Sequence, residues 1–264
     1  MEQVILISLG IVSGLLGGML GIGGGVVIVP ALIIIYELTS LHAPGDITVI
    51  AVATSMACII FTSISAAYTQ FRAGKVRFDL VVKLVPFFVI GSLVAGLTTP
   101  HLEAALLRML IGVFLLFVAI VMLTNWRPDP RRAFPGHVGS LLTGLSGGMV
   151  SGTAGIAGGN VIVPTLVYFN VPMHNATATS STMGVPIALA GALGYATGVP
   201  SGGTSWMLGL IDLQSWLFIT VGAIAAAPIG VKFAHRVPAD KLKRVFGAFL
   251  LLVACRMLYT SLSL

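Results

Sequence analysis

The sequence predicts an all-α integral membrane protein with two inverted-topology repeats, each containing a glycine-broken hairpin and three transmembrane helices. The first observation is composition: 57% of the 264 residues are hydrophobic and only 8% are charged, whereas about a quarter of the residues in soluble domains are charged. The second is a series of eight apolar runs, because a membrane span needs roughly 20 apolar residues. The third is an internal duplication, in which residues 21–30 and 155–164 are identical at eight of ten positions.

The apolar runs define the expected elements. Two of them, 3–36 and 138–170, are too long for one straight span and are interrupted by glycines. We expect each to fold as a re-entrant hairpin or as a pair of short spans, with the reversal close to the glycines. The other six runs should each form one spanning helix. They are residues 48–71, 80–99, 104–124, 176–199, 206–231 and 245–263.

The duplication divides the chain into two halves. Two further pairs of segments match in order, namely Ala51–Ser55 with Ala176–Ser180 and Gly112–Leu123 with Gly247–Leu258. We therefore predict a first transmembrane repeat over residues 1–125 and a second over 138–264. The segment between them, 126–137, is rich in prolines and charges, which is typical of a loop rather than of a span. It is predicted to be a cytoplasmic connector.

The basic residues predict the orientation, because Lys and Arg concentrate in cytoplasmic loops. Twelve of the 14 Lys and Arg residues fall into three clusters, at 72–83, 127–132 and 232–244. If all three clusters are inside, the loop at 100–103 is outside, whereas its counterpart at 237–243 is inside. Equivalent loops on opposite sides mean that the repeats are inverted and that both termini are outside. The net charge of +6 is then explained by the membrane's cytoplasmic face, and nucleic acid is not an expected partner.

The glycine segments are the first candidate site. Two hairpins that enter from opposite faces would bring their tips together near the bilayer midplane, where inverted-repeat transporters place their substrate. A helix that restarts after a glycine reversal aims free N–H groups and about half a positive charge at that point, so an anion could bind without a buried Lys or Arg. The alternative is that the glycines only permit close helix packing. The candidate residues are Gly23, Gly24, Gly25, Gly158, Gly159 and Asn160.

Polar side chains near these segments are the second set of candidates. The hydroxyl pairs Thr54 with Ser55 and Thr179 with Ser180 can donate hydrogen bonds to an oxyanion without adding charge. Their alternative role is hydrogen bonding between helices or to the preceding turn of their own helix. Asn160, which replaces Val26 of the first repeat, could orient a substrate or satisfy the broken backbone.

What the apolar runs lack is also informative. All eight acidic residues and all five histidines lie in loops or at the ends of runs, so we expect no buried carboxylate or imidazole proton relay. This favours an anion or a neutral substrate over a cation, and it argues against an intramembrane hydrolase, which needs a nucleophile beside a base. Arg256 should extend toward the membrane surface. Cys58 and Cys255 are expected to be packing residues, and neither a metal site nor a cofactor is predicted.

Taken in order, these segments resemble the sulfite exporter TauE/SafE family of membrane permeases. The residues that carry the resemblance are GIGGGVVIVPAL at 21–32, AVATS at 51–55, RAGKVR at 72–77, GIAGGNVIVP at 155–164 and ATATSS at 176–181. The resemblance covers nearly the whole chain. It implies a multi-pass protein of the plasma membrane that exports sulfite or a related sulfur-containing anion such as sulfoacetate. It does not select the anion.

Three mechanisms are compatible with the residues. One is a secondary transporter that works by alternating access, with one repeat rocking against the other around the glycine tips. The second is a passive anion channel, and the third is a membrane scaffold subunit that transports nothing. The chain contains no ATP-binding motif. A homodimer is compatible with the sequence, which shows no interface.

Overall fold

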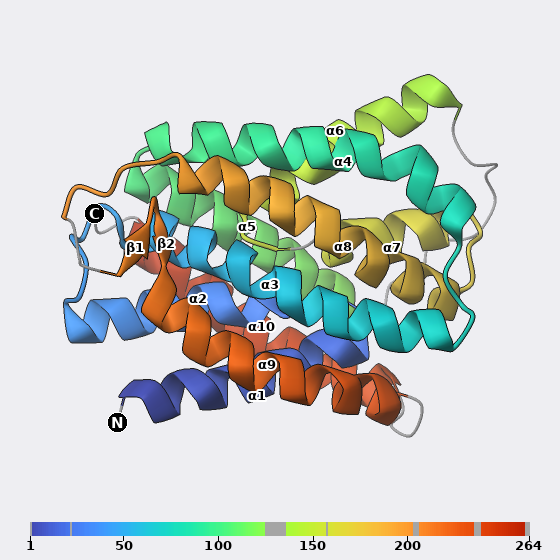
Figure 1. Ribbon diagram of the computed structural model, residues 1–264, viewed down its shortest axis with the longest axis horizontal. Coiled ribbons are helices and arrows are strands. Elements are labelled where there is room, and N and C mark those ends of the chain that lie inside the picture. Colours follow the sequence, from blue (N-terminus) through green and yellow to red (C-terminus); the bar gives the residue numbers. More distant parts are fainter. Residues whose placement is uncertain are drawn as a thin grey trace.

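The computed structural model describes residues 2–21, 23–124, 136–156, 158–202, 206–234 and 239–261. These residues form an all-helical bundle with one short two-stranded ribbon (Figure 1). The first half contains α1 (Glu2–Leu20), α2 (Gly25–Thr39), α3 (Ile47–Arg72), α4 (Phe78–Thr98), the 3-10 turn η1 (Thr99–His101) and α5 (Ala104–Leu123). The second half contains α6 (His137–Thr153), α7 (Gly159–Tyr168), α8 (Met173–Ala196), β1 (Met207–Leu208), β2 (Ile211–Asp212), α9 (Leu213–Ala234) and α10 (Ala239–Ser261).

Both glycine-broken runs fold into two helices that reverse at the glycines, as predicted. The helices of the first pair have 19 and 15 residues, or about 28 and 22 Å at 1.5 Å per residue, and so approach the roughly 30 Å of a bilayer core. In the second pair α7 has only 10 residues, or about 15 Å. The first pair is therefore closer to two short spans, and the second closer to a re-entrant hairpin.

Five of the described helices are long and apolar enough to cross a membrane, namely α3, α4, α5, α9 and α10. The sixth predicted span corresponds to α8, which has 24 residues but is less apolar because its first half is rich in Thr and Ser. Large apolar side chains such as Leu93, Phe117 and Phe233 face outward, as expected of a surface in contact with lipid tails. Cys58 is buried, as predicted, whereas Cys255 is exposed.

The helices pack mainly across the two halves of the chain. At the centre α3 packs against α8, α4 covers α8 and α9 covers α3, while α1 packs on α9, α6 on α4 and α5 on α10. Exchanging the halves, so that α1 becomes α6 and α4 becomes α9, leaves this set of pairs unchanged. Close packing of α1 on α9 depends on small residues, because a Cβ on Gly10, Gly14 or Gly18 would overlap carbonyl oxygens of α9. This pattern agrees with a duplication.

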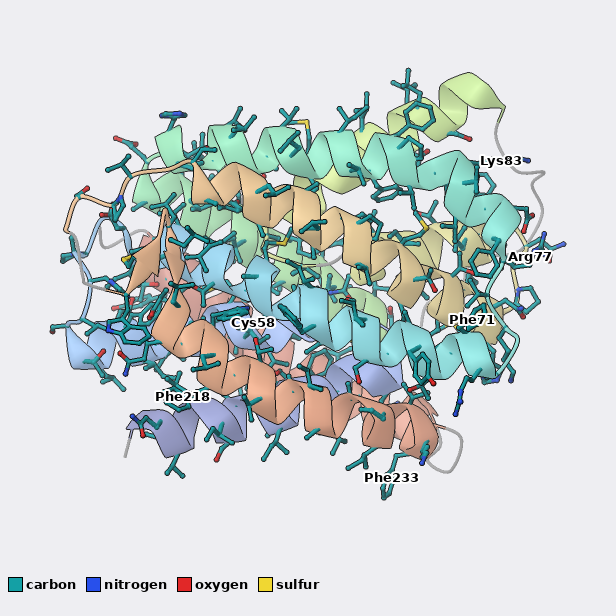
Figure 2. The ribbon with its side chains drawn as sticks, in the orientation of Figure 1. Cys58, Phe71, Arg77, Lys83, Phe218 and Phe233 are labelled. Carbon is teal, nitrogen blue, oxygen red and sulfur yellow. The ribbon has the colours of Figure 1, made fainter. Side chains whose placement is uncertain are left out.

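The two ends of the bundle differ in what they carry. In Figure 1 both chain termini, the loop before α3 and the β1–β2 ribbon are at the left end, while the α3–α4 junction is at the right. Figure 2 shows Arg77 and Lys83 of the first basic cluster at this right end. The first hairpin opens to the left and the second to the right, which is the arrangement expected of inverted repeats. The inverted relation of the complete halves stays a prediction, and 125–135, which includes most of the connector and the second basic cluster, is outside the described residues.

Candidate functional site

The first glycine turn places an open helix N-terminus inside the bundle. Gly21, Gly23 and Gly24 have positive φ angles of 70°, 71° and 80°, a backbone region that residues with a Cβ rarely adopt. Gly24 is the N-cap of α2, and its carbonyl accepts the N–H of Val27 at 3.0 Å. The first N–H groups of a helix have no partner within it, and no described residue accepts the N–H groups of Gly25 and Val26 at the start of α2.

The second glycine turn repeats this geometry. Gly155 and Gly158 have φ angles of 68° and 76°, so they match Gly21 and Gly24 in conformation as well as in sequence. Gly158 is the N-cap of α7, with its carbonyl accepting the N–H of Val161 at 2.9 Å. Gly159 is the first residue of α7 and its N–H has no acceptor in the part of the chain that the structure describes. The structure does not describe Ala157, the counterpart of Gly23.

The two turns contact one another, as the sequence predicted. A Cβ on Gly25 would overlap the carbonyl oxygen of Gly155. Two serines hold the turns from the opposite half: the Ser55 hydroxyl of α3 donates to the carbonyl of Gly155 at 2.9 Å, and the Ser180 hydroxyl of α8 donates to the carbonyl of Gly21 at 3.4 Å. The hydroxyls expected to donate to an anion thus donate to the backbone, which is the interhelical alternative.

The two threonines support neighbouring segments instead. The Thr54 hydroxyl oxygen accepts the backbone N–H of Asp212 at 3.0 Å, just before α9. In the second half, the Thr179 hydroxyl oxygen accepts the N–H of Arg77 at 3.1 Å, just before α4. Thr54 and Thr179 therefore occupy equivalent positions and anchor the starts of equivalent helices. Neither forms a hydrogen bond with a glycine turn among the described residues, so their part in anion binding stays a prediction.

Asn160 is the one polar side chain that distinguishes the two turns. It is the second residue of α7 and is 8% exposed, and its Nδ2 atom has no hydrogen-bond partner among the described residues. Leaving a buried donor unpaired costs about 1–3 kcal/mol. Val26 occupies the equivalent place at the start of α2 and is fully buried. The structure therefore places an unpaired amide donor beside the open N-terminus of α7 alone.

A buried arginine at the other end of α2 was missed by the sequence analysis. Arg108 of α5 is 4% exposed, and its guanidinium contacts Glu37 of α2 at 2.8 Å and Thr48 at 2.8 Å. Arg256 of α10 also contacts Glu37, at 3.3 Å, while its side chain stays about half exposed, so its extension toward the membrane surface stays a prediction. The sequence did contain a signal for this pair, because Arg108 and Arg256 are the only Lys or Arg residues outside the three clusters.

A buried carboxylate also corrects the expectation that none exists. Asp212 is 3% exposed. Its carboxylate accepts hydrogen bonds from Tyr36 at 2.9 Å and Ser215 at 2.7 Å, and Nε2 of His42 is 3.5 Å away. Burial raises the pKa of Asp212, but the interactions with His42, Ser215 and Tyr36 lower it by a larger amount. The pKa therefore lies below its ordinary value. The group is ionised at neutral pH, but it lies in the ribbon at one end of the bundle rather than between the turns (Figure 1).

Comparisons with known proteins agree with this architecture. The family described as sulfite exporter TauE/SafE matches residues 6–257. A probable membrane transporter protein of Haemophilus influenzae is 29% identical over 256 residues, which cover 94% of this chain and 95% of that protein. One of Bacillus subtilis is 24% identical, with 87% and 89% covered, and one of Methanocaldococcus jannaschii is 25% identical, with 93% and 91% covered. No solved structure matches the chain. This multi-pass membrane protein therefore belongs to the sulfite exporter TauE/SafE family of membrane transporters.

Proposed function

We propose that this transporter exports a small sulfur-containing anion, sulfite or an organosulfonate such as sulfoacetate, which binds where the two glycine turns meet. The observation that carries the proposal is the unpaired amide of Asn160 beside the open N-terminus of α7. The family's description supports sulfite as the first anion to test. Sulfite oxygens are hydrogen-bond acceptors and suit the N–H donors of Asn160 and of the two helix N-termini.

The electrostatics of the site favour an anion of low charge. Each helix N-terminus carries about half a positive charge, so the starts of α2 and α7 together offer about one. Glycine at both caps leaves the backbone N–H groups accessible to a ligand. An anion held by backbone dipoles and one neutral amide can leave without breaking an ion pair, which suits a site that must release its substrate. In this proposal Ser55 and Ser180 act as positioning residues, because they hold the carbonyls of the two turns.

The packing limits how access to this site can alternate. If one sequence repeat rocked against the other as a rigid body, α3 would separate from α8 and α5 from α10, because each of these interfaces joins the two halves. The short helices α2 and α7 have fewer neighbours, and each packs chiefly on one helix of its own half, α3 or α8. We therefore place the movement at α2 and α7, around the serine contacts, rather than between complete repeats.

Flux of labelled sulfite into proteoliposomes tests the proposal. Saturable uptake and counterflow are expected of a carrier, whereas a passive channel would show neither, and a scaffold would give no flux. In the variant Asn160→Val we expect flux to fall by about tenfold, the loss of roughly 1.4 kcal/mol of binding. Its thermal stability should stay the same or rise, because an unpaired buried amide is removed.

A matched control separates binding from folding. Asn175 lies outside the glycine turns and donates from Nδ2 to the carbonyl of Lys75 at 2.9 Å. Asn175→Val should therefore lower the unfolding temperature while flux per folded protein is retained. Flux that is unchanged in Asn160→Val would contradict the site.

A further inference from the structure

A pocket with charged side chains lies at the end of α2 that is far from the glycine turn. It has a volume of about 550 Å³ and is lined by the last residues of α2, the loop before α3, the start of α3 and Arg108 of α5. Pockets that bind small molecules usually have volumes of about 300–1,000 Å³. The pocket is at the end of the bundle that carries the chain termini, which the basic residues predict to be outside.

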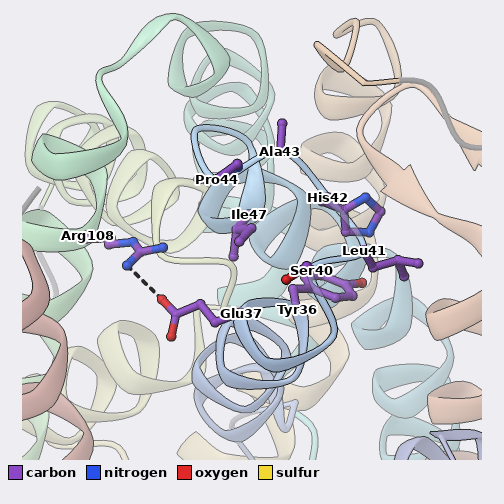
Figure 3. Close-up of a pocket in the computed structure, with 9 residues that line it drawn as sticks. All are labelled: Tyr36, Glu37, Ser40, Leu41, His42, Ala43, Pro44, Ile47 and Arg108. Atoms are coloured by element: carbon purple, nitrogen blue, oxygen red, sulfur yellow. Dashed lines mark ion pairs between the residues drawn. The ribbon is translucent and has the colours of Figure 1, made fainter.

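Arg108 gives this pocket a buried positive charge. Its Nε and Nη1 atoms contact Thr48 and Glu37, while a guanidinium has five N–H donors in total. Figure 3 shows the guanidinium on one side of the pocket, with its ion pair to Glu37 below it. Glu37 is shared between Arg108 and Arg256, so this cluster of three side chains has one positive charge in excess.

His42 lies on the opposite side of the pocket and makes no hydrogen bond to a described residue (Figure 3). Its side chain is 1% exposed, and neither ring nitrogen has a hydrogen-bond partner among the described residues. The nearest acidic atom in the described ion pairs is Oδ2 of Asp212, at 3.5 Å from Nε2, which is too long for a good hydrogen bond. The ring of Tyr36 packs edge-on against the imidazole at 4.5 Å.

We propose that this pocket is a second anion-binding site, in which a small oxyanion displaces Glu37 from Arg108 while His42 takes up a proton. The site is separate from the glycine turns, and its binding does not depend on the function proposed for them. Glu37 acts as the resident anion of the empty pocket, and the ligand replaces its carboxylate with oxygens of the same geometry. An Arg fork suits this exchange, because it binds planar or tetrahedral oxyanions through two parallel N–H groups.

The charges that face His42 explain why a proton should accompany the anion. Glu37 lies on α2, Arg108 on α5, Arg256 on α10 and Asp212 just before α9, and together they carry two positive and two negative charges. Asp46 in the loop before α3 is bonded to Ser201 instead. With neutral His42 the set is balanced and an arriving anion adds a net negative charge. Protonated His42 makes the set positive, so the proton offsets part of the charge that the anion brings.

Sulfate binding to the purified full chain tests the proposal, because the charge of sulfate does not change between pH 6 and pH 8. The measurements use the Asn160→Val background, so that the glycine turns contribute less to the binding that is measured. We expect sulfate to bind more tightly at pH 6 than at pH 8, and this difference to disappear in His42→Gln. Failure of the function proposed for the glycine turns would leave both results unaffected.

Glu37→Gln is the most decisive variant. If Glu37 is only a structural partner of Arg108, removing its charge should not improve sulfate binding. If its carboxylate competes with the ligand, removing it should strengthen sulfate binding. Removing the competing carboxylate should lower the sulfate Kd by about tenfold, equivalent to 1.4 kcal/mol. Arg108→Gln leaves Glu37 with one partner and could impair folding. The double variant Arg108→Gln with Glu37→Gln keeps similar side-chain volumes without that unpaired charge, and it should abolish the pH-dependent binding. Sulfate affinity that is unchanged or weaker in Glu37→Gln, or retained in the double variant, would overturn the proposal.

Discussion

The turn before α2 and the turn before α7 start their helices in the same way but have different surroundings. A Cβ on Gly24 would lie 2.6 Å from the carbonyl oxygen of Ser13, whereas one on Gly158 would first meet the flexible end of Ile162, at 2.8 Å. At its cap residue the first turn is therefore enclosed by backbone, which cannot move aside, and the second by side chains, which can. Together with the unpaired Asn160, this points to the first turn as a fixed support and the second as the adaptable side of the site.

The largest effect is expected where the turns meet. In Gly25→Ala the new methyl group would overlap the carbonyl of Gly155 and lie 2.6 Å from the end of Ile59. We expect sulfite flux to fall below about a tenth and the unfolding temperature to drop, since overpacking costs about 1–3 kcal/mol. Gly202→Ala is the control, because no atom lies within 4 Å of its Cβ position. Normal flux in Gly25→Ala would show that contact between the turns is not required.

The next comparison separates backbone strain from crowding. Gly24, Gly158 and Gly74 all have positive φ, but nothing lies within 4 Å of a Cβ on Gly74. Gly74→Ala should therefore show only the cost of a left-handed residue, about 1–2 kcal/mol. Thermal unfolding of the three alanine variants should rank Gly24→Ala as the least stable, with Gly158→Ala close to Gly74→Ala. Equal losses in all three would mean that the first turn is no more enclosed than the second.

Exchanging the residues that differ between the two turns, Val26 and Asn160, should affect stability and flux unequally. Val26→Asn buries an amide at a fully buried position and should reduce stability by about 1–3 kcal/mol if the amide finds no partner. The reverse change, Asn160→Val, should cost no stability but lose flux. Thermal unfolding and flux, measured on both variants, check this. A stable Val26→Asn with raised flux would show that the first turn can also bind substrate.

The smallest effects are expected at the two serines. Ser55→Ala removes a hydrogen bond of 2.9 Å and Ser180→Ala one of 3.4 Å, so we expect losses of about 1 kcal/mol and less, respectively. Ser146→Ala, at an exposed serine that bonds within its own helix, should be close to neutral. A larger loss of stability in Ser180→Ala than in Ser55→Ala would contradict the inference that the Ser55 hydrogen bond is the stronger of the two.

The site was only partly predictable from the sequence. The glycines, Asn160 and the meeting of the turns followed from the duplication, because equivalent breaks in two hairpins must face one another if the hairpins enter from opposite sides. The roles of the hydroxyls did not follow. Thr54 and Ser55 are adjacent in sequence, yet one contacts the segment before α9 and the other the second glycine turn, because successive residues point about 100° apart around a helix.

Which segments are membrane helices, and where the two hairpins reverse, could be predicted from the amino-acid sequence. In lipid, every backbone group must find its partner locally, so run length, apolar content and glycine position decide these features. The meeting of distant side chains could not be predicted in this way: Tyr36 reaches Asp212 across 176 residues, and Arg108 and Arg256 converge on Glu37 from two other helices. Such partners depend on how helices pack across the two halves, which no local pattern encodes.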